Sequence, residues 1–249
     1  MTDRRDLLLR EMGLGLRWVL RASAPSAEPA VQIDVADVPN SSGAFNASNI
    51  AINVDFPAVA SVAVADMDWA QLATAVKSCQ ACGLCASRKQ TVFGVGDQSA
   101  DVMIIGEAPG AEEDRLGEPF VGPAGQLLDS MLAAVKMKRT TKIYIANVLK
   151  CRPPDNRNPS ANEVAQCSPH LQRQIALVKP KLIVAMGRFA AQTLLATDAS
   201  IASMRGKQFS YHNTPLIVTY HPAYLLRSLP DKAKAWEDLL FMRQTLAAT

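Results

Sequence analysis

The sequence has no long uninterrupted apolar run, which argues against an integral membrane protein. Its first 21 residues, MTDRRDLLLREMGLGLRWVLR, mix charges among the apolar residues and so make a poor secretory signal. Of its 249 residues, 49% are hydrophobic and 20% are charged, a composition typical of a soluble globular protein. The length fits one substantial domain with an appendage, and we expect a monomer.

The chain is also poor in cysteine, and its five cysteines cannot all form pairs. Three lie close together in CQACGLC, namely Cys79, Cys82 and Cys85, and the others are Cys151 and Cys167. This pattern argues against a disulfide framework and favours a metal site in a reducing cytoplasm. Structural zinc usually takes a second close pair, whereas four dispersed thiolates also suit a [4Fe–4S] cluster. Spacing alone therefore leaves three alternatives open. The cysteines could bind zinc, they could hold a cluster, or Cys151 and Cys167 could be core thiols that bind no metal.

Positive charge is missing from Ala22 to Val76, a stretch rich in Ala, Ser, Pro, Val and Asn. We interpret residues 23–64 as a flexible linker and residues 1–22 as an amphipathic peptide that docks to a protein partner. An unconstrained tail is the alternative. Residues 65–249 form the predicted folded domain. From residue 71 onward there are 21 basic and 14 acidic residues, which permits a polyanionic partner without demanding one.

Strand and helix signals alternate through the predicted domain. Short, almost entirely apolar segments predict strands at 101–106, 142–150, 181–187 and 215–222, and helical patterns follow them. The fold class is therefore α/β, a three-layer αβα sandwich with a central four-stranded parallel sheet. Ligands of such sheets bind beyond the carboxyl ends of the strands. Those ends place Glu107, Asn147, Gly187 and His221 around one crevice.

The loop GEAPGAEED, residues 106–114, is not a phosphate loop. It lacks the GK[ST] ending, and the Gly-x-Gly of FGVGD comes before the first predicted parallel strand instead of after it. Its four acids would repel a pyrophosphate. They suit a neutral ligand or a developing positive charge.

Three long motifs and the cysteine triplet together resemble family 4 uracil-DNA glycosylases. The motifs are GEAPGAEEDRLGEPFVGPAGQLLD, NVLKCRPPDNRNPSANEVAQC and HPAYLLR, with CQACGLC upstream. The resemblance implies a structural [4Fe–4S] cluster on Cys79, Cys82, Cys151 and Cys167. It also implies excision of uracil from single- and double-stranded DNA. Related glycosylases that trap uracil on a histidine carry that residue in a basic insertion, and CRPPDNRNPS contains no histidine.

The resemblance assigns roles to individual residues of the crevice. Phe120 would stack on the flipped uracil, and Asn147 would read the base through its amide. His221 would donate a hydrogen bond to uracil O2 as charge develops on the leaving base. Glu113 would crowd the methyl group of thymine, and Glu107 would position the attacking water. Taken singly, Phe120 could be a core residue, Asn147 a loop cap and His221 structural.

Four further sets of residues complete the prediction. The backbone amides of Ala108 and Gly110 would hold uracil O2. Leu225 or Leu226 would fill the gap left in the duplex, and Arg227 would contact phosphate. Asp114 could equally be a helix cap, and either leucine could belong to the core.

The sequence thus predicts a cytoplasmic, monofunctional uracil-DNA glycosylase for base excision repair. It would hydrolyse the N-glycosidic bond of deoxyuridine and leave an abasic site, with water as the nucleophile and no diffusible cofactor. Two alternatives come from other classes of protein. One is an iron–sulfur electron carrier, and the other is a non-catalytic module that binds damaged DNA without releasing the base.

Overall fold

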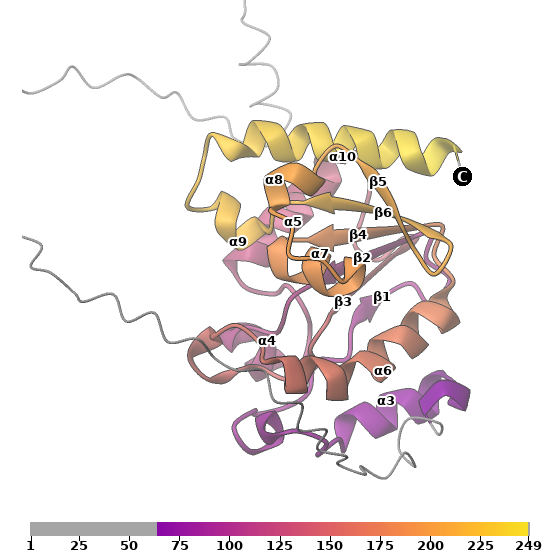
Figure 1. Ribbon diagram of the computed structural model, residues 1–249, viewed down its shortest axis with the longest axis vertical. Coiled ribbons are helices and arrows are strands. Elements are labelled where there is room, and N and C mark those ends of the chain that lie inside the picture. The colour runs from indigo at the N-terminus through magenta and orange to yellow at the C-terminus, as the bar shows by residue number, and fades with distance from the viewer. Residues whose placement is uncertain (1–63, 249) are drawn as a thin grey trace, which may run out of the picture.

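A computed structural model describes residues 64–248, which are built around one mixed sheet (Figure 1). The strand order is β1-β3-β2-β4-β6-β5, and the four central strands are parallel. The strands are β1 Val95–Gly96, β2 Val102–Gly106, β3 Ile143–Asn147, β4 Leu182–Met186, β5 Gln208–Tyr211 and β6 Thr214–Thr219. The predicted N-terminal peptide, and the predicted linker up to residue 63, lie outside the described residues.

Helices cover both faces of this sheet, so the domain has three layers (Figure 1). One face packs against α6, α7 and α8, and the other packs against α5, α9 and α10. The helices are α3 Trp69–Lys77, α4 Ala111–Leu116, α5 Pro123–Ala134, α6 Ala161–Val178, α7 Arg188–Leu195, α8 Ile201–Met204, α9 Pro222–Leu225 and α10 Asp231–Ala248, with short 3-10 turns η1 Gly83–Ala86 and η2 Pro154–Asn156. In residues 64–248, no helix combines the length and apolar character that crossing a membrane requires.

The central strands are apolar throughout because both of their faces are buried. In β2, Met103 and Ile105 point into the core on the α6 side, and Val102 and Ile104 point into the core on the α5 side. Alternate side chains of a strand point to opposite faces, so a strand buried on both sides needs no polar residue. This explains why the sequence showed continuous apolar runs.

The α3 helix begins at a capping box formed by Asp68 and Gln71. Asp68 accepts a hydrogen bond from the Gln71 backbone N–H at 2.8 Å, and the Gln71 side chain accepts one from the Asp68 N–H at 2.9 Å. This capping box satisfies two donors that a helix start leaves open. Trp69 then packs edge-on against Phe93 and Tyr144, with ring centroids 5.3 Å apart in each pair. The helix is thereby fixed to the sheet just ahead of Cys79.

The predicted α/β class and the central parallel strands are confirmed. The structure adds two antiparallel edge strands that the sequence did not reveal, β1 and β5. The first has only two residues, and the second, QFSY, alternates between exposed and half-buried positions. Neither carries the apolar run by which the central strands were recognised.

Candidate active site

The carboxyl ends of the parallel strands open into one pocket of about 1130 Å³, its open side included. Glu107 and Asn147 come from the ends of β2 and β3, and His221 follows the end of β6. Loops between these ends complete the wall. The other lining residues are Ala108, Pro109, Gly110, Glu113, Phe120, Ala124, Pro153, Asn156, Arg157, Asn158, Ala223, Tyr224 and Arg227. The structure thus brings together the three predicted catalytic residues.

Glu113 ties two loops of the pocket together. One carboxylate oxygen accepts a hydrogen bond from Gly110 N–H at 3.1 Å, and the other accepts from Val121 N–H at 3.0 Å and Gly122 N–H at 3.2 Å. The Gly110 amide thus already donates to Glu113, and its predicted bond to uracil O2 stays a prediction. Glu113 itself lines the pocket. Its predicted role against thymine stays a prediction.

Asp114 does not cap a helix. Its side chain is 2% exposed and accepts hydrogen bonds from Lys89 N–H at 2.9 and 3.1 Å. It therefore fastens the segment after the cysteine triplet to α4.

Phe120 forms one wall of the pocket in a conformation that few residues adopt. Its φ is 56°, and the carbonyls of Pro119 and Phe120 accept hydrogen bonds from Arg139 at 2.9 and 2.8 Å. A Cβ on Gly125 would meet the Phe120 carbonyl oxygen, so only glycine fits there. The Phe120 ring stacks on the His221 ring, with centroids 5.3 Å apart and planes 28° apart. A non-glycine residue held at positive φ costs energy, and strain of this kind is often found at functional sites.

Asn147 lies beside this ring with an unsatisfied acceptor. The residue is 2% exposed, and its Oδ1 atom has no hydrogen-bond partner. A buried amide oxygen without a partner is costly, so an Asn kept this way points to a ligand that supplies the donor. The structure therefore disfavours Asn147 as a loop cap.

Gly106 makes the room for both side chains. A Cβ at this position would lie 2.4 Å from Asn147 Oδ1 and 2.7 Å from the Phe120 ring. We expect Gly106→Ala to fold but to slow the reaction of this site by about 10²-fold, because small displacements of positioned groups have effects of that size. Single-turnover kinetics and circular dichroism would measure both quantities. Gly83→Ala is the matched control, because a Cβ there meets nothing within 4 Å. Equal effects of the two changes would contradict this explanation.

His221 is held as a neutral imidazole with a defined proton. Burial lowers its pKa to about 4, although Glu113 opposes this shift. Its Nδ1 atom accepts a hydrogen bond from Ala223 N–H at 3.1 Å. The neutral ring must therefore carry its proton on Nε2, which makes Nε2–H a donor.

Glu107 has a carboxyl group whose pKa is raised by burial, while Arg188 counteracts this shift. Its backbone carbonyl accepts a hydrogen bond from Leu149 N–H at 3.0 Å, which continues the pairing of β2 with β3. A carboxyl group with a raised pKa, facing the pocket, is suited to exchange a proton with a bound water.

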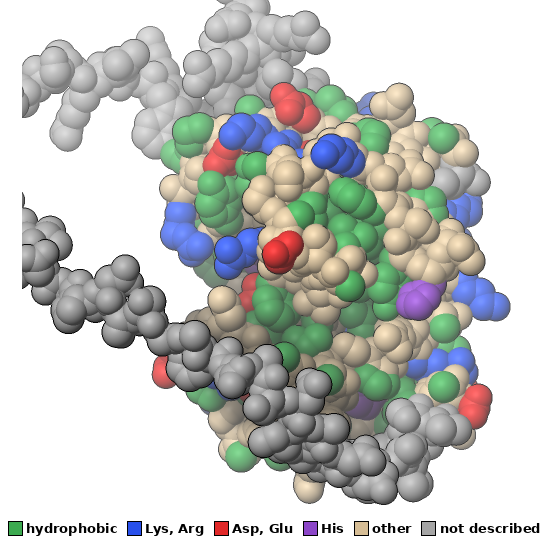
Figure 2. Space-filling model, in the orientation of Figure 1, with side chains coloured by type: hydrophobic (Ala, Val, Ile, Leu, Met, Phe, Trp, Pro, Cys, Tyr) green, Lys and Arg blue, Asp and Glu red, His purple; other side chains and the backbone are tan. Residues whose placement is uncertain are grey.

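The segment after His221 separates two neighbouring leucines. Leu225 is 1% exposed and packs in the core below α5 and α10, so its predicted contact with DNA is wrong. Leu226 is 44% exposed, and Arg227 lines the pocket. Basic side chains gather over α9 and the start of α10 (Figure 2). Of the two leucines, only Leu226 can reach a partner.

A buried ion pair supports the His221 side of the pocket. Asp238 accepts hydrogen bonds from Arg205 at 2.7 and 2.8 Å and from the Thr219 hydroxyl at 2.7 Å. The Arg205 guanidinium also lies 4.8 Å from the centre of the Tyr220 ring. These contacts fix the end of β6 immediately before His221.

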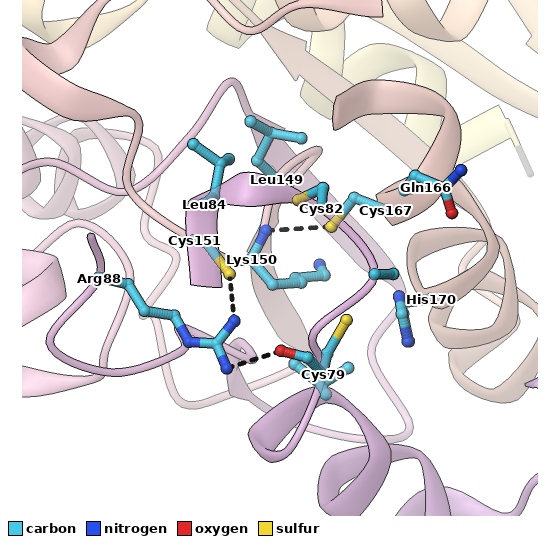
Figure 3. A pocket seen from close by; sticks show the side chains of 12 residues that line it. Cys79, Cys82, Leu84, Arg88, Leu149, Lys150, Cys151, Gln166, Cys167 and His170 are labelled. Atoms are coloured by element: carbon cyan, nitrogen blue, oxygen red, sulfur yellow. Dashed lines mark hydrogen bonds between the residues drawn. The ribbon is translucent and has the colours of Figure 1, made fainter. Parts of the chain in front are cut away.

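A second pocket is lined by the four cysteines predicted to hold a cluster. Cys79, Cys82, Cys151 and Cys167 surround it in Figure 3. Cys85 is not among its lining residues. The structure therefore brings together segments that precede β1 and follow β3.

Main-chain and side-chain donors point at these sulfur atoms. Arg88 donates to Cys151 Sγ at 3.1 Å and to the Cys79 carbonyl at 2.7 Å, and Lys150 N–H donates to Cys167 Sγ at 3.3 Å (Figure 3). Burial raises the pKa of Cys151, and it raises the pKa of Cys167 to about 11. Without a cation these thiols stay protonated at neutral pH.

Four cysteine side chains lining one pocket fit the ligand set of an iron–sulfur cluster. In the described part of the chain, no three His, Cys, Asp or Glu side chains lie close enough together to hold one metal ion. Hydrogen bonds from N–H groups to the cysteine sulfurs are also a common feature of cluster sites.

Comparison with known proteins identifies the family. Residues 93–240 match the family model described as the uracil DNA glycosylase superfamily. The chain is 42% identical to a type-4 uracil-DNA glycosylase of Archaeoglobus fulgidus, over 61% of this chain and 79% of that protein. It is 40% identical to one of Pyrobaculum aerophilum, over 70% of this chain and 92% of that protein, and 41% identical to one of Thermotoga maritima, over 64% and 83%. The chain therefore belongs to the uracil DNA glycosylase superfamily and, within it, to the type-4 family. This confirms the resemblance seen in the sequence motifs.

Proposed function

We propose that this protein is a monofunctional uracil-DNA glycosylase that removes uracil from single- and double-stranded DNA. The names of the relatives support this proposal. The observation of the site that carries it is the buried Asn147 Oδ1 atom, which has no hydrogen-bond partner. Uracil offers an N3–H donor to that oxygen and an O4 acceptor to the neighbouring NH₂ group. Cytosine offers the opposite pattern, so it would leave buried polar groups unpaired.

The pocket must receive a base that has left the duplex. Flipping exposes the glycosidic bond, and Phe120 provides the aromatic face on which the base stacks, for about 1–3 kcal/mol. Leu226 is the exposed apolar side chain available to fill the gap in the stack, with Arg227 on a phosphate. The amide of Ala108 is proposed to approach uracil O2.

Bond cleavage develops negative charge on the base and positive charge on the sugar. His221 Nε2–H stabilises the base by donating to O2, and its neutral form suffices for this. A carboxylate near the sugar favours the oxocarbenium character of the transition state, and Glu107 of the acidic loop lines the pocket. Glu107 orients the water that attacks the sugar. Hydrolysis by water leaves an abasic site without cutting the strand.

The cysteine pocket is proposed to hold a structural [4Fe–4S] cluster on Cys79, Cys82, Cys151 and Cys167. Such a cluster supplies crosslinks between distant segments, and no step of the reaction needs it to change its oxidation state. Arg88 and the Lys150 amide stabilise two of the thiolates.

The pH dependence follows from the state of His221. Because its pKa is lowered to about 4 from an ordinary 6.5, we expect no inflection near pH 6.5 in the single-turnover rate between about pH 5 and 8. The unfolded chain binds a proton at this site between pH 6.5 and 4, whereas the folded chain does not. The stability that His221 contributes is therefore present above pH 6.5 and is lost as the pH falls towards 4. An inflection near pH 6.5 that vanishes in His221→Gln would contradict this assignment.

Single-turnover release of uracil tests the proposed function. Matched single-stranded and U:G duplex oligonucleotides would be incubated with iron-loaded protein, and strand breaks would be read with and without alkali. Release of free uracil, with breaks only after alkali, supports a monofunctional glycosylase. Binding without release would instead support the damage-binding module. No binding, together with reversible reduction by mild reductants, would support the electron carrier.

A further inference from the structure

Lys150 is a buried cation that lacks a carboxylate partner. Its side chain is 2% exposed, and its Nζ atom donates a hydrogen bond to the Asn147 backbone carbonyl at 2.8 Å. Within residues 64–248, no ion pair joins it to an Asp or Glu. Lysine is rarely buried unless its charge is compensated, so this position calls for a nearby anion.

The candidates for that anion are the cysteines of the same pocket. Lys150 lines the pocket of the four thiols, where its side chain lies among them in Figure 3. Its backbone N–H donates to Cys167 Sγ at 3.3 Å, and the next residue in the chain is Cys151. Four thiolates on a [4Fe–4S] cluster carry net negative charge. That charge would neutralise the buried ammonium.

Lys150 also contacts the segment that carries Asn147, the residue proposed to recognise the base. Its side chain folds back to Asn147, the last residue of β3. Beyond this point the backbone stays paired with β2, because Val148 N–H donates to the Gly106 carbonyl at 2.9 Å. The bond from Lys150 fixes the peptide plane that follows Asn147, and so it helps to fix where the Asn147 amide sits.

We propose that Lys150 is a positioning residue that connects the two pockets. Its ammonium is held by the thiolates of the cluster and holds the Asn147 carbonyl, so an assembled cluster sets the position of the base-reading amide. This inference rests on the proposed function and on the proposed cluster. It assigns the cluster an effect on uracil recognition without any transfer of electrons.

A double-mutant cycle tests the connection to Asn147. Lys150→Met keeps most of the length of the side chain and removes its charge and its donors. We expect it to slow single-turnover uracil release by about 10- to 100-fold per iron-loaded protein, and by less than about 2-fold when Asn147→Ala is already present. Lys181→Met is the matched control, because Lys181 is exposed and pairs with Asp101 at the surface. Additive losses in the cycle would overturn the positioning role.

Iron retention tests the connection to the cysteines, and it does not depend on catalysis. We expect Lys150→Met to lose iron and visible absorbance several-fold faster than the wild type in the presence of a chelator. Lys150→Gln keeps a donor for the Asn147 carbonyl but has no charge. It should recover much of the uracil release and none of the iron retention.

The outcomes separate this inference from the proposed function. If the wild type releases uracil and the two Lys150 variants retain iron as it does, the charge compensation is wrong. If the wild type releases no uracil, the proposed function fails, and the iron measurement still reports on the buried ammonium. Circular dichroism would confirm that the variants fold. If Lys150→Met does not fold, Lys150→Gln takes its place in the cycle: we expect its smaller loss of uracil release to disappear when Asn147→Ala is present, and its iron loss to be faster in both Asn147 backgrounds.

Discussion

Replacing Asn147 with alanine is expected to slow uracil release by about 10²–10³-fold. The change removes an acceptor for N3–H and a donor for O4, and hydrogen bonds of this kind contribute about 1–3 kcal/mol each when they are buried. Because Oδ1 has no partner within the protein, the folded state loses no hydrogen bond of that atom in the variant. We therefore expect the thermal midpoint to stay near that of the wild type.

The measurement is single-turnover release at saturating protein, with Asn162→Ala as the control. Asn162 is an exposed residue in the first turn of α6, so its loss should change neither rate nor stability. A rate for Asn147→Ala within about 3-fold of the wild type would show that the amide does not read the base. A large fall in the thermal midpoint would show that Asn147 is structural instead.

Replacing Cys151 with alanine is expected to have the largest effect on stability. Cys151 is buried, accepts a hydrogen bond from Arg88, and lies where the segment after β3 meets the segment before β1. Loss of one thiolate should release the cluster and the crosslinks it provides. For a domain of this size a loss of a few kcal/mol lowers the thermal midpoint by about 10 °C.

Cys85→Ala provides the matched control for this change, because Cys85 does not line the pocket. Iron content, visible absorbance and thermal unfolding would be measured for both variants. We expect Cys85→Ala to retain iron and Cys151→Ala to lose it. Equal iron contents would exclude Cys151 as a ligand, and loss of iron from Cys85→Ala alone would assign the fourth thiolate to Cys85.

The crevice could be predicted from sequence because its residues stand at the ends of apolar strands. Glu107, Asn147 and His221 each follow such a strand, and parallel topology alone brings these ends together. The same apolar segments also predict that the central strands are parallel and buried on both faces. The edge strands β1 and β5 could not be found in this way, because they are short or half exposed.

Contacts between distant segments were harder to predict. Asp114 binds the backbone at Lys89, and nothing in the local sequence distinguishes it from a helix cap. Leu225 and Leu226 are adjacent and chemically alike, so only the path of α9 shows which one is buried. Gly110 was expected to offer a free backbone N–H, but this N–H donates a hydrogen bond to the carboxylate of Glu113, three residues later.

One important residue, Lys150, has a signal in the sequence itself. Lys150 interrupts a buried apolar stretch, ANVLKC, where a lysine needs a compensating charge. Arg139 holds the loop of Phe120 from 19 residues away, and only the fold shows that contact. The left-handed φ of Phe120 has no local sequence marker either.

The two walls of the base pocket depend on different kinds of bond. The Asn147 wall is joined to the cysteine segments through Lys150, while the His221 wall rests on the buried pair of Arg205 and Asp238. With the proposed cluster in place, oxidants and chelators would disturb the side of the pocket that carries Asn147, whereas acid would disturb the side that carries His221. A cell could lose selectivity and speed of repair separately, depending on which chemical stress the protein meets.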